Sequence, residues 1–249
     1  MRHPSPVLVV VAHGSRDARH AATVHALVER VRRMRPGLRV ETGFLDFNVP
    51  SVPAVLESLA AEGVRDVVAL PLLLTRAFHA KADIPAVLRE APPRLRIRQA
   101  EVLGPSPLLI GALERRLYEA GLDPAEKSST GVVLASAGST DPEASAVIAD
   151  IAREWRHTGW CAVRPAFASA ALPRTEDVVR ELRALGCARV AVAPYVLAPG
   201  FLPDRIARGA AEARADVLAE VLGPAPEVAR VLLERYDAAR RPALTALGA

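Results

Sequence analysis

The sequence predicts an α/β protein made of two similar domains, each a small parallel sheet flanked by helices, with a cleft between them for the active site. Three observations predict this fold class. Apolar runs typical of buried parallel strands alternate with segments of helical periodicity. That order of segments occurs twice along the chain. Hydrophobic residues make up 51% of the 249 residues, which is enough for two cores.

The chain contains an internal duplication, visible as paired segments of related sequence. The pairs are VLVVVAHGSRD (7–17) with GVVLASAGSTD (131–141), PLLLTRAFH (71–79) with PYVLAPGFL (194–202), and a Leu-Gly-Pro at 103–105 and again at 222–224. A period of this length indicates duplicated domains rather than a solenoid. We therefore expect a first domain over residues 1–122 and a second domain over residues 131–249.

In the first copy, strands are expected where apolar residues run continuously, and helices where they recur every three or four positions. Pro36 and Gly37 stop the first helix, and Ser51 is a suitable N-cap for the second. The expected strands are 7–12, 39–47, 67–74 and 96–102, and the expected helices are 17–34, 51–63, one that begins near 83, and 107–119.

The second copy repeats this order after a polar linker over residues 121–130. Its expected strands are 132–137, 161–168, 188–197 and 216–221, and its expected helices are 142–157, 175–185, 202–213 and 226–239. Such strand–helix alternation implies parallel sheets with right-handed crossovers, which bind ligands at the carboxyl ends of their strands. The functional residues should therefore lie at that end.

Composition argues against several functional classes. The net charge is only +4, and no long basic run suggests a nucleic-acid partner. The apolar stretch before His13 is too short for a signal peptide or a membrane span, so we expect a cytoplasmic protein with no membrane partner. Since two fused copies could replace a dimer or form one further, both a monomer and a homodimer are compatible with the sequence. Cys161 and Cys187 lack the Cys-x-x-Cys spacing and are expected to be buried free thiols.

Three polar side chains are expected at the carboxyl ends of successive strands in the first copy. His13 ends the first strand, Asp46 ends the second, and His79 lies just past the third. Two imidazoles and a carboxylate can hold a divalent transition metal while leaving coordination positions open. In the second copy, Ala137 and Leu202 replace the two histidines. Each residue alone would also fit an ordinary strand end, but the three together favour a metal site.

The turn after His13 is a candidate for contacting an anionic substrate. Gly14 and Ser15 precede a helix whose first N–H groups would suit a substrate acid. The alternative is a structural role, in which Gly14 permits the tight turn and Ser15 caps the helix. Arg16 and Arg19 could reach the mouth of the cleft or could be solvated surface side chains.

The loop after the third strand carries further candidates for substrate binding. Arg76 and Lys81 could hold substrate carboxylates, and Phe78 could stack on a flat ring. The alternative is an ordinary solvated loop. Two more histidines, His20 and His25, lie on the first helix and are expected to pack rather than to bind.

At these residues the chain resembles the sirohydrochlorin chelatase family, the class II tetrapyrrole chelatases of the CbiX and SirB type. The matching segments are AHGSRD at 12–17, GFLDF at 43–47, and FH at 78–79 followed by DIP at 83–85. The duplicated layout, with the two histidines in one half only, is similar to the longer members of that family. The family commonly has Glu where this chain has Asp46.

The resemblance implies a lyase that inserts Fe²⁺ or Co²⁺ into sirohydrochlorin, in sirohaem or cobalamin biosynthesis. The metal ion is then a co-substrate, Ni²⁺ is a further candidate, and no organic cofactor is implied. The family's metal-contacting histidines map onto His13 and His79. The assisting carboxylate maps onto Asp46, which is one methylene shorter and would ligate the ion directly, through water, or act as a base.

Three other functions stay open at this point. The protein could be a ferrochelatase for a less acidic porphyrin, or a non-enzymatic protein that binds metal or tetrapyrrole. It could also be a hydrolase in which the same residues activate water through a metal. Neither copy contains a GxGxxG or Walker loop, so no nucleotide is expected.

Overall fold

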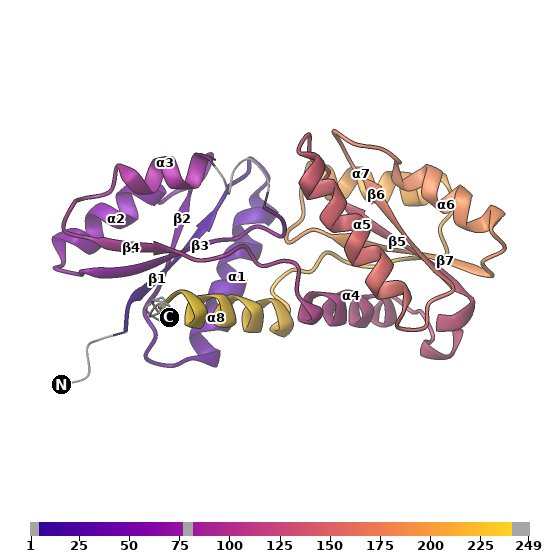
Figure 1. The fold of residues 1–249 in the computed structure, drawn as a ribbon, viewed down its shortest axis with the longest axis horizontal. Coiled ribbons are helices and arrows are strands. Elements are labelled where there is room, and N and C mark those ends of the chain that lie inside the picture. The colour runs from indigo at the N-terminus through magenta and orange to yellow at the C-terminus, as the bar shows by residue number, and fades with distance from the viewer. Residues whose placement is uncertain (1–4, 77–81, 241–249) are drawn as a thin grey trace, which may run out of the picture.

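Two parallel sheets of four strands each form the framework of the protein (Figure 1). The computed structural model describes residues 5–76 and 82–240. The strand order is β2-β1-β3-β4 in the first sheet and β6-β5-β7-β8 in the second, so one topology occurs twice. The predicted fold class of two similar α/β halves is therefore confirmed.

The first half alternates strands and helices in the predicted order. Its elements are β1 (Val7–Ala12), α1 (Ala18–Met34), β2 (Val40–Phe44), α2 (Val52–Ala61), β3 (Asp66–Pro71), α3 (Ile84–Arg89) and β4 (Arg96–Gln99). β1 is an inner strand, and all of its residues are buried because helices cover both faces of the sheet. Asp17 caps α1 by accepting a hydrogen bond from the Arg19 amide, and Ser51 caps α2 as predicted.

The second half repeats these elements. They are β5 (Thr130–Ser136), α5 (Pro142–Arg156), β6 (Ala162–Phe167), α6 (Thr175–Ala184), β7 (Arg189–Tyr195), α7 (Phe201–Glu212) and β8 (Val217–Leu218). The linker contains a 3-10 helix, η2 (Pro124–Ser129), that leads directly into β5. β8 is shorter than the predicted strand. Beyond Leu218, backbone amides still donate hydrogen bonds to carbonyls in and after β7, but not in a regular strand pattern.

The closing helix of each half packs against the other half. α4 (Pro107–Glu119) follows β4 yet packs on β7, and α8 (Pro226–Arg240) follows β8 yet packs on α1, β3 and β4. Figure 1 shows α8 below the first sheet and α4 below the second. The two helices also contact each other, with Arg115 Nη2 2.8 Å from a Glu227 carboxylate oxygen. Each half is thus completed by a helix from the other.

One hydrophobic core runs through both halves as a result of this exchange. Its buried members include Leu8 of β1, Val132 of β5 and the apolar faces of α4 and α8. Two smaller cores fill the opposite face of each sheet. The domain boundaries at residues 122 and 131 stay a prediction, because each half packs together with a helix that belongs to the other half in sequence.

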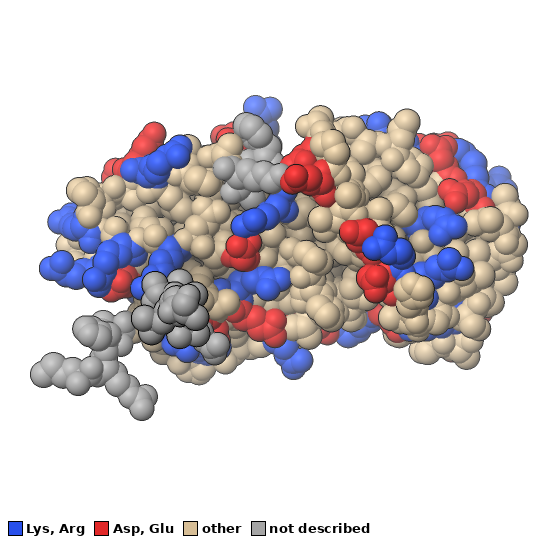
Figure 2. Space-filling model, in the orientation of Figure 1, with Lys and Arg blue, Asp and Glu red and all other residues tan. Residues whose placement is uncertain are grey.

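Charged side chains of both signs are interspersed on the face shown in Figure 2. Several arginines are held in ion pairs, such as Arg35 with Asp237 at 2.7 Å and Arg96 with Asp66 at 2.6 Å. The surface charge is therefore balanced largely by local pairs.

Among residues 5–76 and 82–240, no helix is long and apolar enough to cross a membrane.

Candidate active site

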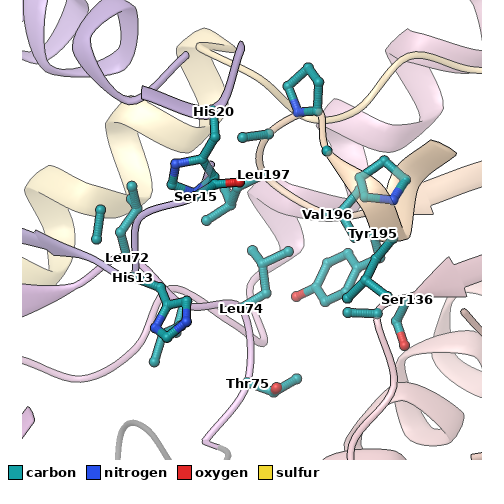
Figure 3. A pocket seen from close by; sticks show the side chains of 18 of the residues that line it. His13, Ser15, His20, Leu72, Leu74, Thr75, Ser136, Tyr195, Val196 and Leu197 are labelled. Atoms are coloured by element: carbon teal, nitrogen blue, oxygen red, sulfur yellow. The ribbon is translucent and has the colours of Figure 1, made fainter. Parts of the chain in front are cut away.

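A pocket of about 440 Å³ lies between the two halves, at the carboxyl ends of the strands (Figure 3). The first half lines it with the ends of β1 and β3 and the start of α1, and the second half with the ends of β5 and β7 and parts of α5 and α7. Among the described residues that line it, the titratable side chains are His13, His20 and Tyr195. The remaining lining is apolar or carries only small hydroxyls, which is typical of a binding pocket with few polar groups.

His13 follows directly after β1 and lines the pocket with an exposed side chain. Its carbonyl accepts a hydrogen bond from the Asp46 amide at 2.9 Å. The backbones of the first two strands therefore stay paired up to the carboxyl-end edge of the sheet, which we call the rim. Its ring meets the Phe47 ring edge-to-face, with 6.5 Å between centroids. His13 therefore lies at the carboxyl end of β1, as the sequence predicted.

The turn after His13 depends on a glycine. Gly14 has φ of 94°, and a Cβ there would lie 1.9 Å from the Asp46 carbonyl oxygen. The next amide, of Ser15, donates to the Asn48 side-chain oxygen at 2.8 Å. Asn48 therefore ties the β1–α1 turn to the loop after β2. The sequence did not indicate this role of Asn48, since a loop asparagine carries no distinctive signal.

The N–H groups at the start of α1 are mostly bonded within the protein. The Asp17 amide donates to Ser15 Oγ at 3.1 Å, and the Arg19 amide donates to Asp17 Oδ1 at 2.9 Å. The alternative in which Ser15 caps the helix is wrong, because Asp17 is the N-cap. Fewer amides are available for a substrate acid than the sequence suggested, although the Ser15 side chain does line the pocket.

Asp46 lies next to His13 along the rim, beyond the end of β2. The strand ends at Phe44 rather than at residue 47, because Phe47 adopts a left-handed φ of 60° and turns the chain. The exposed Asp46 carboxylate accepts a hydrogen bond from the Phe47 amide at 2.8 Å. Its side chain is directed at its own loop and does not belong to the pocket lining described above.

The predicted substrate-binding residues are placed unequally. The Arg16 guanidinium lies 5.1 Å from the centre of the Phe47 ring, which is itself 50% exposed at the rim. Arg76 lies outside the described pocket lining, and its Nη2 is 2.9 Å from a Glu101 carboxylate oxygen, with both side chains exposed. The candidates Phe78, His79 and Lys81 lie outside the described residues.

His20 lines the pocket, although its place on the first helix predicted a packing role. It lies in the first turn of α1 and lines the pocket beside Ser15, as Figure 3 shows. Its Nδ1 is buried and has no hydrogen-bond partner within the described part of the chain. Burial lowers the pKa of His20, and the nearby His13 lowers it further. His25 packs its ring against Phe44, as expected, with 5.8 Å between centroids.

Tyr195 is the titratable side chain on the opposite wall. It ends β7, and Figure 3 shows its hydroxyl pointing across the pocket towards Leu74. The hydroxyl is buried without a hydrogen-bond partner among the described residues, and burial raises the pKa of Tyr195. A Cβ at Gly104 would lie 2.4 Å from this oxygen, so the glycine gives the ring its space.

The second half reproduces the rim without its titratable groups. Gly138 has φ of 88°, and a Cβ there would lie 1.9 Å from the Ser169 carbonyl oxygen, as in the first half. The Ser169 amide donates to the Ala137 carbonyl at 2.9 Å, so these residues occupy the places of Asp46 and His13. The structure therefore adds Ser169 to the replacements that the sequence indicated.

Comparisons with known proteins give the family. The family model described as CbiX matches residues 7–120 and again residues 131–239. The sirohydrochlorin cobaltochelatase of Priestia megaterium is 30% identical over 212 residues, which cover 82% of this chain and 68% of that protein. The sirohydrochlorin ferrochelatase of Bacillus subtilis strain 168 is 28% identical over 236 residues, which cover 92% and 89% of the two chains.

A solved structure agrees with these matches over nearly the whole length. SirB from Bacillus subtilis, determined with Fe³⁺, has a TM-score of 0.83 and 26% sequence identity, covering 95% of this chain and 96% of that one. The resemblance to chelatases of the CbiX and SirB type is therefore confirmed. With two copies of the family model along its length, the chain belongs to the CbiX family.

Proposed function

We propose that the protein is a lyase that inserts Fe²⁺ or Co²⁺ into sirohydrochlorin. One observation carries the proposal: among the described residues that line the largely apolar pocket between the halves, the imidazoles are His13 and His20, both from the first half. Relatives named as sirohydrochlorin cobaltochelatase and ferrochelatase support both the substrate and the choice of metals. The product would then belong to sirohaem or cobalamin biosynthesis.

The metal ion is a substrate of this reaction and must be held loosely. We assign its first contact to His13 together with His79, which follows β3 in the sequence. Neutral imidazole suits Fe²⁺ and Co²⁺, and two such ligands leave open positions through which the ion passes to the ring nitrogens. Asp46 lies next to His13 along the same rim, and we assign its carboxylate to assisting insertion, by ligating the ion directly, through water, or as a base.

Insertion also requires that two pyrrole protons leave the macrocycle. The acceptor must be unprotonated at working pH and must lie beside the ring. His20 meets the first condition because burial lowers its pKa, and it lines the same pocket as His13. We therefore assign proton acceptance to His20 or His13, with each proton leaving a pyrrole nitrogen for an imidazole nitrogen.

The substrate is a flat ring with carboxylates at its edge, and the site suits both parts. Apolar side chains such as Leu74, Val196 and Leu197 would contact the ring faces. The edge carboxylates would stay in water near the mouth, where Arg16 and Arg19 are exposed. Such an arrangement buries the apolar ring while avoiding the cost of burying its charges.

The test is metal insertion into sirohydrochlorin, followed by absorbance, with Fe²⁺, Co²⁺ and Ni²⁺ in parallel. We expect His13→Ala and His79→Ala each to lower kcat/KM by about a hundredfold or more, since each removes a group that acts at the reacting atoms. His157→Ala, at an exposed position on the helix α5 C-cap, is the matched control. Unchanged rates in both test variants would contradict the proposal.

A second arm of the same assay tests the substrate assignment. A less acidic porphyrin competes for the ring-binding surfaces but has fewer carboxylates for the arginines at the mouth. We expect sirohydrochlorin to be preferred, and the preference to weaken as salt screens the exposed charges. Faster insertion into the less acidic porphyrin would favour the alternative ferrochelatase function.

A further inference from the structure

The chain's two cysteines lie side by side in the structure, although they are 26 positions apart in sequence. The Cys187 thiol donates a hydrogen bond to the Cys161 sulfur, with 3.6 Å between the two Sγ atoms. Cys187 is buried, whereas Cys161 is exposed. The expectation of two buried thiols is therefore wrong for Cys161, which precedes β6 instead of lying within it.

The sheet topology brings these thiols together. Cys161 immediately precedes β6 and Cys187 lies just before β7, and these strands flank β5 on either side. Between them, Gly131 of β5 pairs with Ala162 and with Val190. A Cβ at Gly131 would lie 2.8 Å from the Cys187 sulfur, so the glycine provides the space in which the sulfurs meet.

We propose that Cys161 and Cys187 form a reversible disulfide when the protein encounters a peroxide. Hydrogen peroxide oxidises the exposed Cys161 thiol to a sulfenic acid and releases one water. The Cys187 sulfur then attacks the Cys161 sulfur, the S–O bond breaks, and the oxygen leaves as a second water with the Cys187 proton. In total, two thiols and one hydrogen peroxide give one disulfide and two waters, and the peroxide takes up the two electrons.

The two positions suit different roles in this sequence. Burial and the neighbouring Cys161 sulfur raise the pKa of the Cys187 thiol to about 11, so Cys187 reacts slowly with peroxide itself. Its contact with the Cys161 sulfur, and not its acidity, places Cys187 for the second step. Cys161 is accessible to a peroxide and immediately precedes the edge strand β6. Closing the gap to a disulfide bond requires a movement of about 1.5 Å. The exposed Cys161 can make this movement with little disturbance of packed neighbours.

The disulfide would lie far from the proposed active site. The thiols are at the amino ends of the strands, whereas the pocket is at the carboxyl ends. The length of β5 separates these ends by about 20 Å. The bond would link the start of edge strand β6 to β7 and enclose β6 and α6 in a covalent loop. We therefore expect oxidation to stabilise the second half without entering the pocket.

The experiment treats the full chain with hydrogen peroxide, removes the excess with catalase, and counts free thiols in denaturant with Ellman's reagent. We expect both thiols to be lost, a Cys161–Cys187 cross-linked peptide in the digest, and full recovery with dithiothreitol. We also expect the Tm to rise by about 5–10 °C, as for a loop of this size.

Cys161→Ser is the matched control, because this exposed position tolerates the exchange of sulfur for oxygen. The variant should keep one free thiol after brief oxidation and show no rise in Tm. Persistence of both thiols in the natural protein, formation of disulfide-linked dimers, or the same Tm rise in Cys161→Ser would overturn the proposal. None of these readouts depends on chelatase activity, so they are independent of the proposed function.

Discussion

At the scale of single residues, burial governs the protonation of the His20 imidazole in the pocket. Its Nδ1 is buried without a partner among the described residues, and the pKa of its imidazole is lowered by burial first and by His13 second. A charged imidazole is disfavoured in the folded protein. In the unfolded chain, His20 is protonated with the ordinary histidine pKa of about 6.5. The burial that lowers the pKa of His20 should therefore make the fold sensitive to acid.

We predict that His20→Gln weakens the acid sensitivity of the fold. Because the pKa of His20 is lowered by folding, its contribution is fully present above the unfolded pKa and is lost as pH falls towards the folded one. Urea unfolding at about pH 7 and pH 5 should therefore show a smaller loss in free energy of unfolding for the variant than for the natural protein. His157→Gln, at an exposed position, is the control, and equal losses in all three proteins would count against the prediction.

The sequence was sufficient to place some site residues and not others. His13 could be placed because a buried strand must end where its apolar run ends, and that end is the ligand-binding edge. The direction of the Asp46 carboxylate could not be predicted, because it depends on the left-handed backbone of Phe47. The position of His20 in the pocket lining could not be predicted, because a first-turn histidine faces either the core or the pocket, depending on how the second half is placed.

At the scale of elements, the β1–α1 turn and its counterpart after β5 have the same geometry and different chemistry. Gly14 and Gly138 both have a left-handed φ, and at both a Cβ would collide with a carbonyl oxygen of the neighbouring loop. Only the first turn carries His13. Variants of this pair can therefore separate a structural role of the turn from the catalytic role proposed for His13.

We predict that Gly14→Ala and Gly138→Ala each lower the free energy of unfolding by about 2–4 kcal/mol, because the added Cβ meets backbone in both places. Gly14→Ala should also displace His13 and lower the insertion rate by about a hundredfold, since small displacements at a reacting centre have effects of this size. Gly138→Ala, assayed well below its Tm, should keep most of the activity. Equal loss of activity in both variants would show that the turn acts only through stability.

Helix exchange between the halves is the element-level feature that the sequence did not indicate. The apolar stripes of α4 and α8 predict helices that bury one face, but a stripe does not specify which sheet it covers. The choice depends on the path of the chain between the halves, which only the assembled structure defines. The strands and most helices were predictable because their patterns are local.

At the scale of the whole molecule, the exchanged helices α4 and α8 hold the two halves together. A side-chain ion pair provides a further contact between the halves at the cleft. Across its mouth, Arg19 of α1 lies 2.7 Å from an Asp204 carboxylate oxygen of α7. Both side chains are about half exposed, so water screens the pair and its contribution to stability is small. A substrate with many carboxylates could therefore compete with Asp204 for the Arg19 guanidinium.

We predict that Asp204→Asn lowers the KM for sirohydrochlorin about two- to fivefold with little change in kcat, since it removes a competing carboxylate from the cleft mouth. The Tm should stay within about 2 °C of the natural value, as expected for an exposed ion pair. Asp177→Asn, which removes an exposed partner of Arg180 within α6, is the matched control and should leave KM unchanged. A higher KM in Asp204→Asn would instead mean that the Arg19–Asp204 pair holds the two halves at the spacing that the macrocycle needs.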